Sequence, residues 1–100
     1  MNIKVNCRSK GKHAFVSAVA ALYRQELKLK KSRYTLEINF QQGLRKEGMR
    51  GWVHKMGPKF ILMFLDSSLK DDALIETLAH EMVHVKQYAK GHIQAVRGRK

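Results

Sequence analysis

The segment FILMFL, residues 60–65, constrains the fold most, because it is apolar at every position. A short apolar run without alternation is typical of a central strand that is covered on both faces. The Gly57-Pro58 pair just before it marks a turn. Residues 51–55, before that turn, form a shorter and more polar segment that suits an edge strand. We therefore expect a hairpin whose second strand lies inside a sheet.

Two earlier segments, residues 1–7 and 34–40, have the alternation of apolar and polar side chains that predicts short or half-buried strands. Residues 12–29 lie between them and have the apolar spacing of a helix that covers a sheet. The side chains expected on its buried face are Phe15, Ala18, Val19, Leu22 and Leu29. Residues 41–51 are polar and contain three glycines, which predicts a loop.

A second long helix is expected over residues 69–90, with Ser68 and Asp71 as a capping box at its start and Gly91 as its stop. One hundred residues fit one domain, which we expect to span residues 1–100. The order strand, helix, strand, hairpin, helix predicts an α+β fold. Its small mixed or antiparallel sheet would have a hairpin edge strand and would pack against the two long helices.

The chain is strongly basic, with twenty Lys and Arg residues, eight Asp and Glu residues and a net charge of +12. Fourteen of the basic residues and three of the acidic residues lie within residues 1–59. A basic surface attracts phosphate backbones, so DNA is one expected partner. The alternative interpretation is the solvated surface of a small basic protein.

Three features concern the compartment. The amino terminus, MNIKVNCRSKGKH, lacks the apolar core of a signal peptide, and no apolar run has the length of a membrane helix. Cys7 is the only cysteine and has no partner in the chain for a disulfide. We therefore expect a reducing, cytoplasmic setting.

The second helix contains the pattern His-Glu-x-x-His within residues 74–93, LIETLAHEMVHVKQYAKGHI. A helical wheel predicts a core stripe formed by Ile75, Leu78, Met82, Val85 and Ala89. An adjacent face holds Thr77, His80, Glu81, His84 and Tyr88. Because His80 and His84 are one helical turn apart, both imidazoles can reach one zinc ion. Glu81 lies beside that ion, where a carboxylate can take a proton from zinc-bound water and return it to a leaving amine.

The segment LIETLAHEMVHVKQYAKG closely resembles the active-site helix of the SprT-like zinc metallopeptidases, especially the small versions encoded by phages, and the similarity extends over roughly residues 13–91. The resemblance implies a gluzincin- or Spartan-like zincin domain, in the host cytoplasm if a phage encodes it. It implies that His80 and His84 bind Zn2+ and that Glu81 is the general base and acid of an endopeptidase. It also implies substrates among DNA-associated proteins, whose chains would add as an extra strand to residues 51–55.

The family pattern requires a third metal ligand, usually a His or Glu on a later segment, and here the sequence departs from it. No Asp or Glu follows Glu81, and His92 is the only histidine after His84. His92 is a poor candidate, because a helix that continues to Lys90 carries the chain about 10 Å beyond His84 by Gly91. His54, on the expected edge strand, is a weaker candidate.

We therefore expect the natural chain to continue past Lys100 and to supply the third ligand there. Zinc held by only two histidines and water would bind weakly. The alternative function is a basic nucleic-acid-binding module whose zincin core is catalytically silent. It rests on the missing ligand and on the basic first part of the chain.

Overall fold

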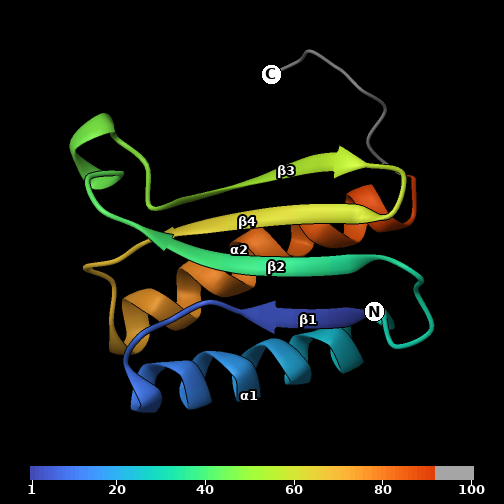
Figure 1. The fold of residues 1–100 in the computed structure, drawn as a ribbon, viewed down its shortest axis with the longest axis horizontal. Helices are drawn as coiled ribbons and strands as arrows, with labels where there is room; N and C mark the ends of the chain where they lie inside the picture. The colour runs from blue at the N-terminus through green and yellow to red at the C-terminus, as the bar shows by residue number, and fades with distance from the viewer. Residues whose placement is uncertain (92–100) are drawn as a thin grey trace.

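A four-stranded mixed sheet forms one of the two layers of the fold in a computed structural model, which describes residues 1–91 (Figure 1). The elements in chain order are β1 (Asn2–Val5), α1 (Lys10–Glu26), β2 (Thr35–Gln41), the 3-10 helix η1 (Arg45–Glu47), β3 (Gly51–Gly57), β4 (Phe60–Asp66) and α2 (Asp71–Ala89). The strand order is β1-β2-β4-β3, in which β3 alone is antiparallel to its neighbour. The prediction of an α+β fold with a small mixed sheet and two long helices is confirmed.

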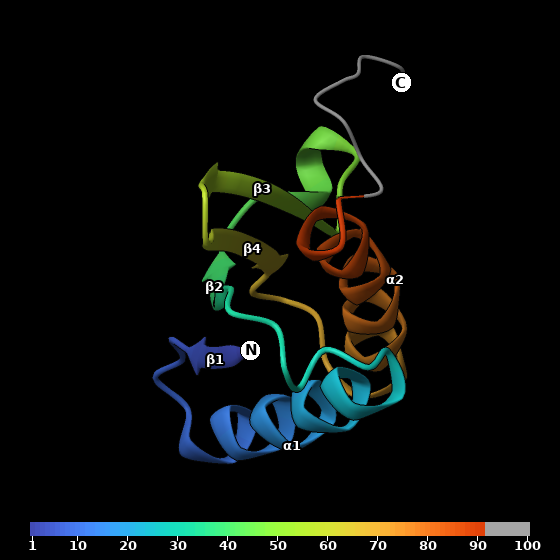
Figure 2. The same cartoon turned by 90° about the vertical axis from the view of Figure 1, so that its right-hand side faces the viewer.

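Both helices pack against the same face of the sheet (Figure 2). Alternate side chains of β2 and β4 point to this face, and five of them are fully buried, namely Leu36, Ile38, Ile61, Met63 and Leu65. They meet Val16 and Ala20 of α1 and the core stripe of α2. Burial of this continuous apolar layer is the main source of stability for such a fold. Within residues 1–91, neither helix combines the length and apolarity needed to span a bilayer.

β4 lies between β2 and β3, so the prediction that it is a central strand in a hairpin is confirmed. The expectation that both its faces are covered is wrong. Phe60, Leu62 and Phe64 lie on the face without helices and are half-buried. On that face the ring of Trp52 in β3 stacks on Phe64, with centroids 4.6 Å apart and an interplanar angle of 17°. Cross-strand aromatic packing therefore shields part of β4 without a second layer.

The predicted buried face of the first helix is only partly correct, because Val19 packs against the core but the fully buried stripe lies about one residue further along the chain. Phe15 is 38% exposed and Leu22 is 55% exposed, whereas Val16 and Ala20 are fully buried. The helix also ends at Glu26, and the chain turns at Lys28, whose φ is 60°, before Leu29 enters the core from the following segment. Apolar residues lie on both sides of the buried stripe of α1. The helical periodicity alone therefore does not decide which of these residues face the sheet.

The expected capping box of Ser68 and Asp71 is also wrong. The N-cap of α2 is Lys70, without a side-chain cap, because the Ser68 hydroxyl donates to Asp66 Oδ1 at 2.6 Å. Asp66 also accepts hydrogen bonds from the backbone N–H groups of Ser68 and Arg45, each at 2.8 Å. These bonds, above all that from the Ser68 side chain, lower the pKa of Asp66 to about 2. Through these hydrogen bonds Asp66, at the end of β4, holds η1 and the segment before α2 in place.

We expect Asp66→Asn to weaken the acid sensitivity of folding. Because the pKa of Asp66 is lower in the folded chain than its ordinary value of about 3.9, its contribution to stability is present above that value and is lost as the pH falls towards 2. The variant lacks this titration, so its free energy of unfolding should fall less steeply between about pH 4 and pH 2. Urea unfolding across this range tests the prediction, with the exposed Asp72→Asn as control. An unchanged slope in Asp66→Asn would contradict it.

Candidate active site

α2 carries all three residues of the His-Glu-x-x-His pattern and orients them differently. The expected core stripe is largely confirmed, since Leu78, Met82 and Val85 are fully buried. On the adjacent face the burial is graded: Glu81 is 6% exposed, His84 is half-buried and His80 is exposed. The carboxylate therefore lies deeper than the imidazoles that flank it.

The two imidazoles lie close to one another on the surface of α2. Their ring centroids are 5.1 Å apart and the ring planes are at 84°. A zinc–nitrogen bond of about 2.0 to 2.1 Å, plus about 1.2 Å from nitrogen to ring centre, places tetrahedral ligands with centroids about 5 Å apart. The centroid separation of the pair is therefore compatible with two histidine ligands on one zinc ion.

Gln87 orients His84, and sequence reasoning missed it. Gln87 Oε1 lies 3.1 Å from His84 Nδ1. When Nδ1 carries the proton and donates to this oxygen, Nε2 keeps its lone pair for a metal, as is usual for metal-ligating histidines. The sequence feature that could have predicted this contact is the spacing of three residues between His84 and Gln87, which places the two side chains next to one another on the helix surface.

Glu81 is buried beneath the start of β3. A Cβ atom on Gly51 would lie 3.3 Å from Glu81 Cγ, so only a glycine leaves this much space between strand and helix. Burial raises the pKa of Glu81, and the charges of His84 and His80 oppose that rise. The carboxylate therefore occupies a partly desolvated place next to both imidazoles.

A cavity of about 540 Å³ opens between α2 and the segment that leads into β3. Its lining comes from residues 48–51 and from Glu76, Thr77, His80 and Glu81. The Thr77 hydroxyl is buried and has no hydrogen-bond partner within residues 1–91. Arg50 and Glu76 form an exposed ion pair at 3.1 Å on the rim, a type of pair that contributes little to stability. The cavity therefore gives a bound molecule access to Glu81 and His80.

Residues 1–91 contain no group of three or more His, Cys, Asp or Glu side chains arranged to hold a metal ion. The suggestion of His54 as third ligand is wrong: strand alternation places Val53 against the core and His54 on the opposite face, where its ring centroid lies 6.1 Å from that of Trp52. His92 and any residue beyond Lys100 lie outside the described residues. The ligand candidates that the described part brings together are His80 and His84.

Comparisons with known proteins add no relative. A scan against protein-family models, a search of curated proteins and a search of solved structures each find no match. The resemblance to SprT-like metallopeptidases therefore stays a prediction from the motif, and the function is argued from the geometry of the site.

Proposed function

We propose that this chain is a zincin-type, zinc-dependent endopeptidase domain. His80 and His84 would hold Zn2+ together with a ligand outside the described residues, and Glu81 would move the proton. The observation that carries the proposal is the 5.1 Å separation of the two imidazole centroids, which matches tetrahedral zinc ligation by a histidine pair. The depth of Glu81 beside that pair supports its separate role.

The reaction would be hydrolysis of a peptide bond. Bound zinc would lower the pKa of a water molecule and polarise the scissile carbonyl. Glu81 would take the proton from the attacking water and return it to the amine of the leaving chain. The position of Glu81 suits this task, because its carboxylate lies beside the proposed metal position and lines the cavity that would hold the substrate.

The arrangement of β3 supports a peptide substrate. β3 is the last strand in the sheet order, so within residues 1–91 one of its edges has no strand neighbour. An extended chain can add to such an edge through main-chain hydrogen bonds. Because β3 begins at Gly51, next to Glu81, a chain aligned with this edge would pass close to the carboxylate.

A metal-binding experiment tests the proposal. We expect the full chain to bind one zinc ion, and His84→Ala to bind it at least tenfold more weakly, because one of two described ligands is lost. Cobalt substitution, read by visible absorption, would report the tetrahedral site, and a chelator should stop cleavage of an unfolded protein substrate. His13→Ala, at an exposed position of α1, is the matched control. Equal zinc affinity in wild type and His84→Ala would exclude the proposed site.

The second candidate function is a basic nucleic-acid-binding module whose core is catalytically silent. It is favoured by the exposed lysines and arginine in the α1–β2 connection and in the β3–β4 hairpin. The two functions are compatible, since a peptidase that acts on DNA-associated proteins requires both. A chain that binds DNA, binds no zinc and cleaves no protein would favour the module alone.

A further inference from the structure

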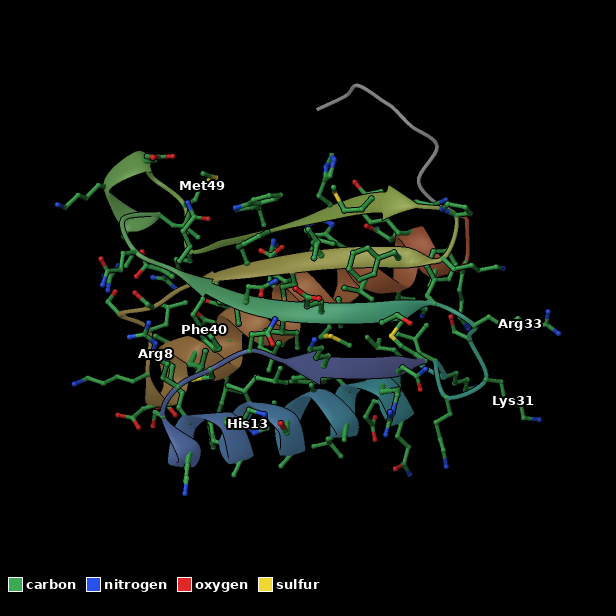
Figure 3. All side chains as sticks on the ribbon, in the orientation of Figure 1. Arg8, His13, Lys31, Arg33, Phe40 and Met49 are labelled. Atoms are coloured by element: carbon green, nitrogen blue, oxygen red, sulfur yellow. The ribbon has the colours of Figure 1, made fainter. Side chains whose placement is uncertain are left out.

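Six basic residues lie in two segments at one end of the sheet, and we call this surface the basic end. Its members are Lys28, Lys30, Lys31 and Arg33 from the α1–β2 connection and Lys55 and Lys59 from the β3–β4 hairpin. All six are exposed. The two segments that carry them, residues 27–34 and 55–59, contain no Asp or Glu. Figure 3 shows Lys31 and Arg33 extending outward from the α1–β2 connection, at the end of the sheet where the β3–β4 hairpin turn also lies.

Tyr34 joins the two segments of the basic end. The Nζ atoms of Lys55 and Lys59 each lie 5.6 Å from the centroid of the Tyr34 ring, from different positions of the hairpin. The backbone N–H of Thr35 donates to Lys59 O at 2.8 Å, which holds the hairpin turn against the start of β2. The clustering is therefore built by tertiary structure, because residues 33 and 59 are far apart in the chain.

The charges of the basic end are not neutralised within the fold. In the part of the chain that the structure describes, none of the six has a carboxylate oxygen within 4.0 Å; Arg50 and Glu76 form the ion pair found there. Neighbouring like charges repel one another and destabilise the folded chain. A bound polyanion would remove that repulsion and would release counterions into solution.

The chemistry of the basic end fits a sugar-phosphate backbone better than a lipid surface. Met56 is the only large apolar side chain that is exposed in its two segments. A surface that enters a membrane combines basic residues with a broad apolar face, and this one lacks such a face. Flexible lysines and an arginine presented by two loops can each meet one phosphate along a strand.

We propose that the basic end binds the sugar-phosphate backbone of a nucleic acid. Lys55 is four residues from Gly51 along β3, about 13 Å at the rise of a strand. A nucleic acid held there would lie towards the other end of β3 from the cavity and would not fill it. Proteins attached to that nucleic acid would then be concentrated next to Glu81. The binding itself is independent of zinc chemistry, whereas this last consequence rests on the proposed peptidase function.

Charge reversal at matched positions tests the proposal. Lys31→Glu with Arg33→Glu alters the basic end, and Lys10→Glu with Lys46→Glu makes the same change in net charge at exposed residues outside it. Fluorescence anisotropy with labelled single-stranded and double-stranded oligonucleotides is measured over a series of salt concentrations. We expect the basic-end variant to bind at least tenfold more weakly at low salt. The slope of log K against log salt should become shallower by roughly 0.7 to 0.9 for each phosphate contact that this variant loses. The slope for the control variant should change much less.

Three results would overturn the proposal: no binding of either oligonucleotide at low salt, equal losses in the two variants, or tighter binding to anionic phospholipid vesicles or polyglutamate than to DNA. Thermal unfolding of both variants checks that they are folded. Lys55→Ala with Lys59→Ala provides a second variant on the other segment and should also weaken binding. Cleavage of a DNA-free peptide, measured in parallel, separates a loss of DNA binding from a failure of the peptidase proposal.

Discussion

Glu81→Gln is expected to reduce peptide cleavage by about 10² to 10⁴-fold while zinc remains bound, because glutamine has the shape of glutamate but does not accept the proton from the attacking water. The histidine pair that is proposed to hold the metal is unchanged by this substitution. The rate of cleavage and the zinc content of the same preparation measure the two parts of the prediction. Glu26→Gln, at the exposed end of α1, is the matched control.

Loss of folding would not explain that loss of rate. Because burial raises the pKa of Glu81, its charged form is less favourable in the folded chain than in water. A neutral amide removes this desolvation cost, so the variant should unfold at a similar or higher denaturant concentration. Cleavage at the wild-type rate by Glu81→Gln would rule out Glu81 as the proton carrier, whatever the zinc content.

Gly51→Ala is expected to lower the free energy of unfolding by about 1 to 3 kcal/mol, the usual cost of overpacking a well-packed contact. An added Cβ would lie 2.9 Å from Phe64 O, 3.0 Å from Leu65 Cδ2 and 3.3 Å from Glu81 Cγ. The backbone oxygen has little freedom to move, so β3 must shift relative to β4 and α2. Urea unfolding measures the stability.

The same substitution should disturb the site, because the start of β3 lies over Glu81. We expect cleavage per folded molecule to fall, in addition to the loss of stability. Gly57→Ala is a matched control in the same strand: a Cβ there meets no atom within 4 Å, so stability and cleavage should remain close to wild type. Equal stability of the two variants would show that β3 and α2 can separate at little cost.

Much of the fold follows from local patterns. Alternation in residues 34–40, the apolar run of β4 and the Gly-Pro turn predicted the strands and the hairpin, and each is present. The wheel of α2 separated Leu78, Met82 and Val85 from His80 and His84, and the burial of these side chains agrees. Such patterns succeed because side chains that share a face recur at the period of the element itself.

Two predictions were wrong because the contact in question depends on a residue from another segment of the chain. Ser68 was expected to cap α2, but its hydroxyl donates a hydrogen bond to the buried carboxylate of Asp66 instead. The buried stripe of α1 passes through Val16 and Ala20, since small side chains let the helix approach the sheet, while Leu22 stays exposed. No local pattern ranks these alternatives, because each depends on a partner from another segment.

The sequence by itself determined the strands, the hairpin, the two helices and the placing of His80, Glu81 and His84 beside one another on α2, because these follow from periods of two and 3.6 residues. Tertiary structure alone decided that Glu81 is buried under Gly51, that His54 faces away from α2 and that Lys55 and Lys59 meet Tyr34. The physical reason is that strand order, register and helix approach arise from contacts between distant segments, whose energies no single segment contains.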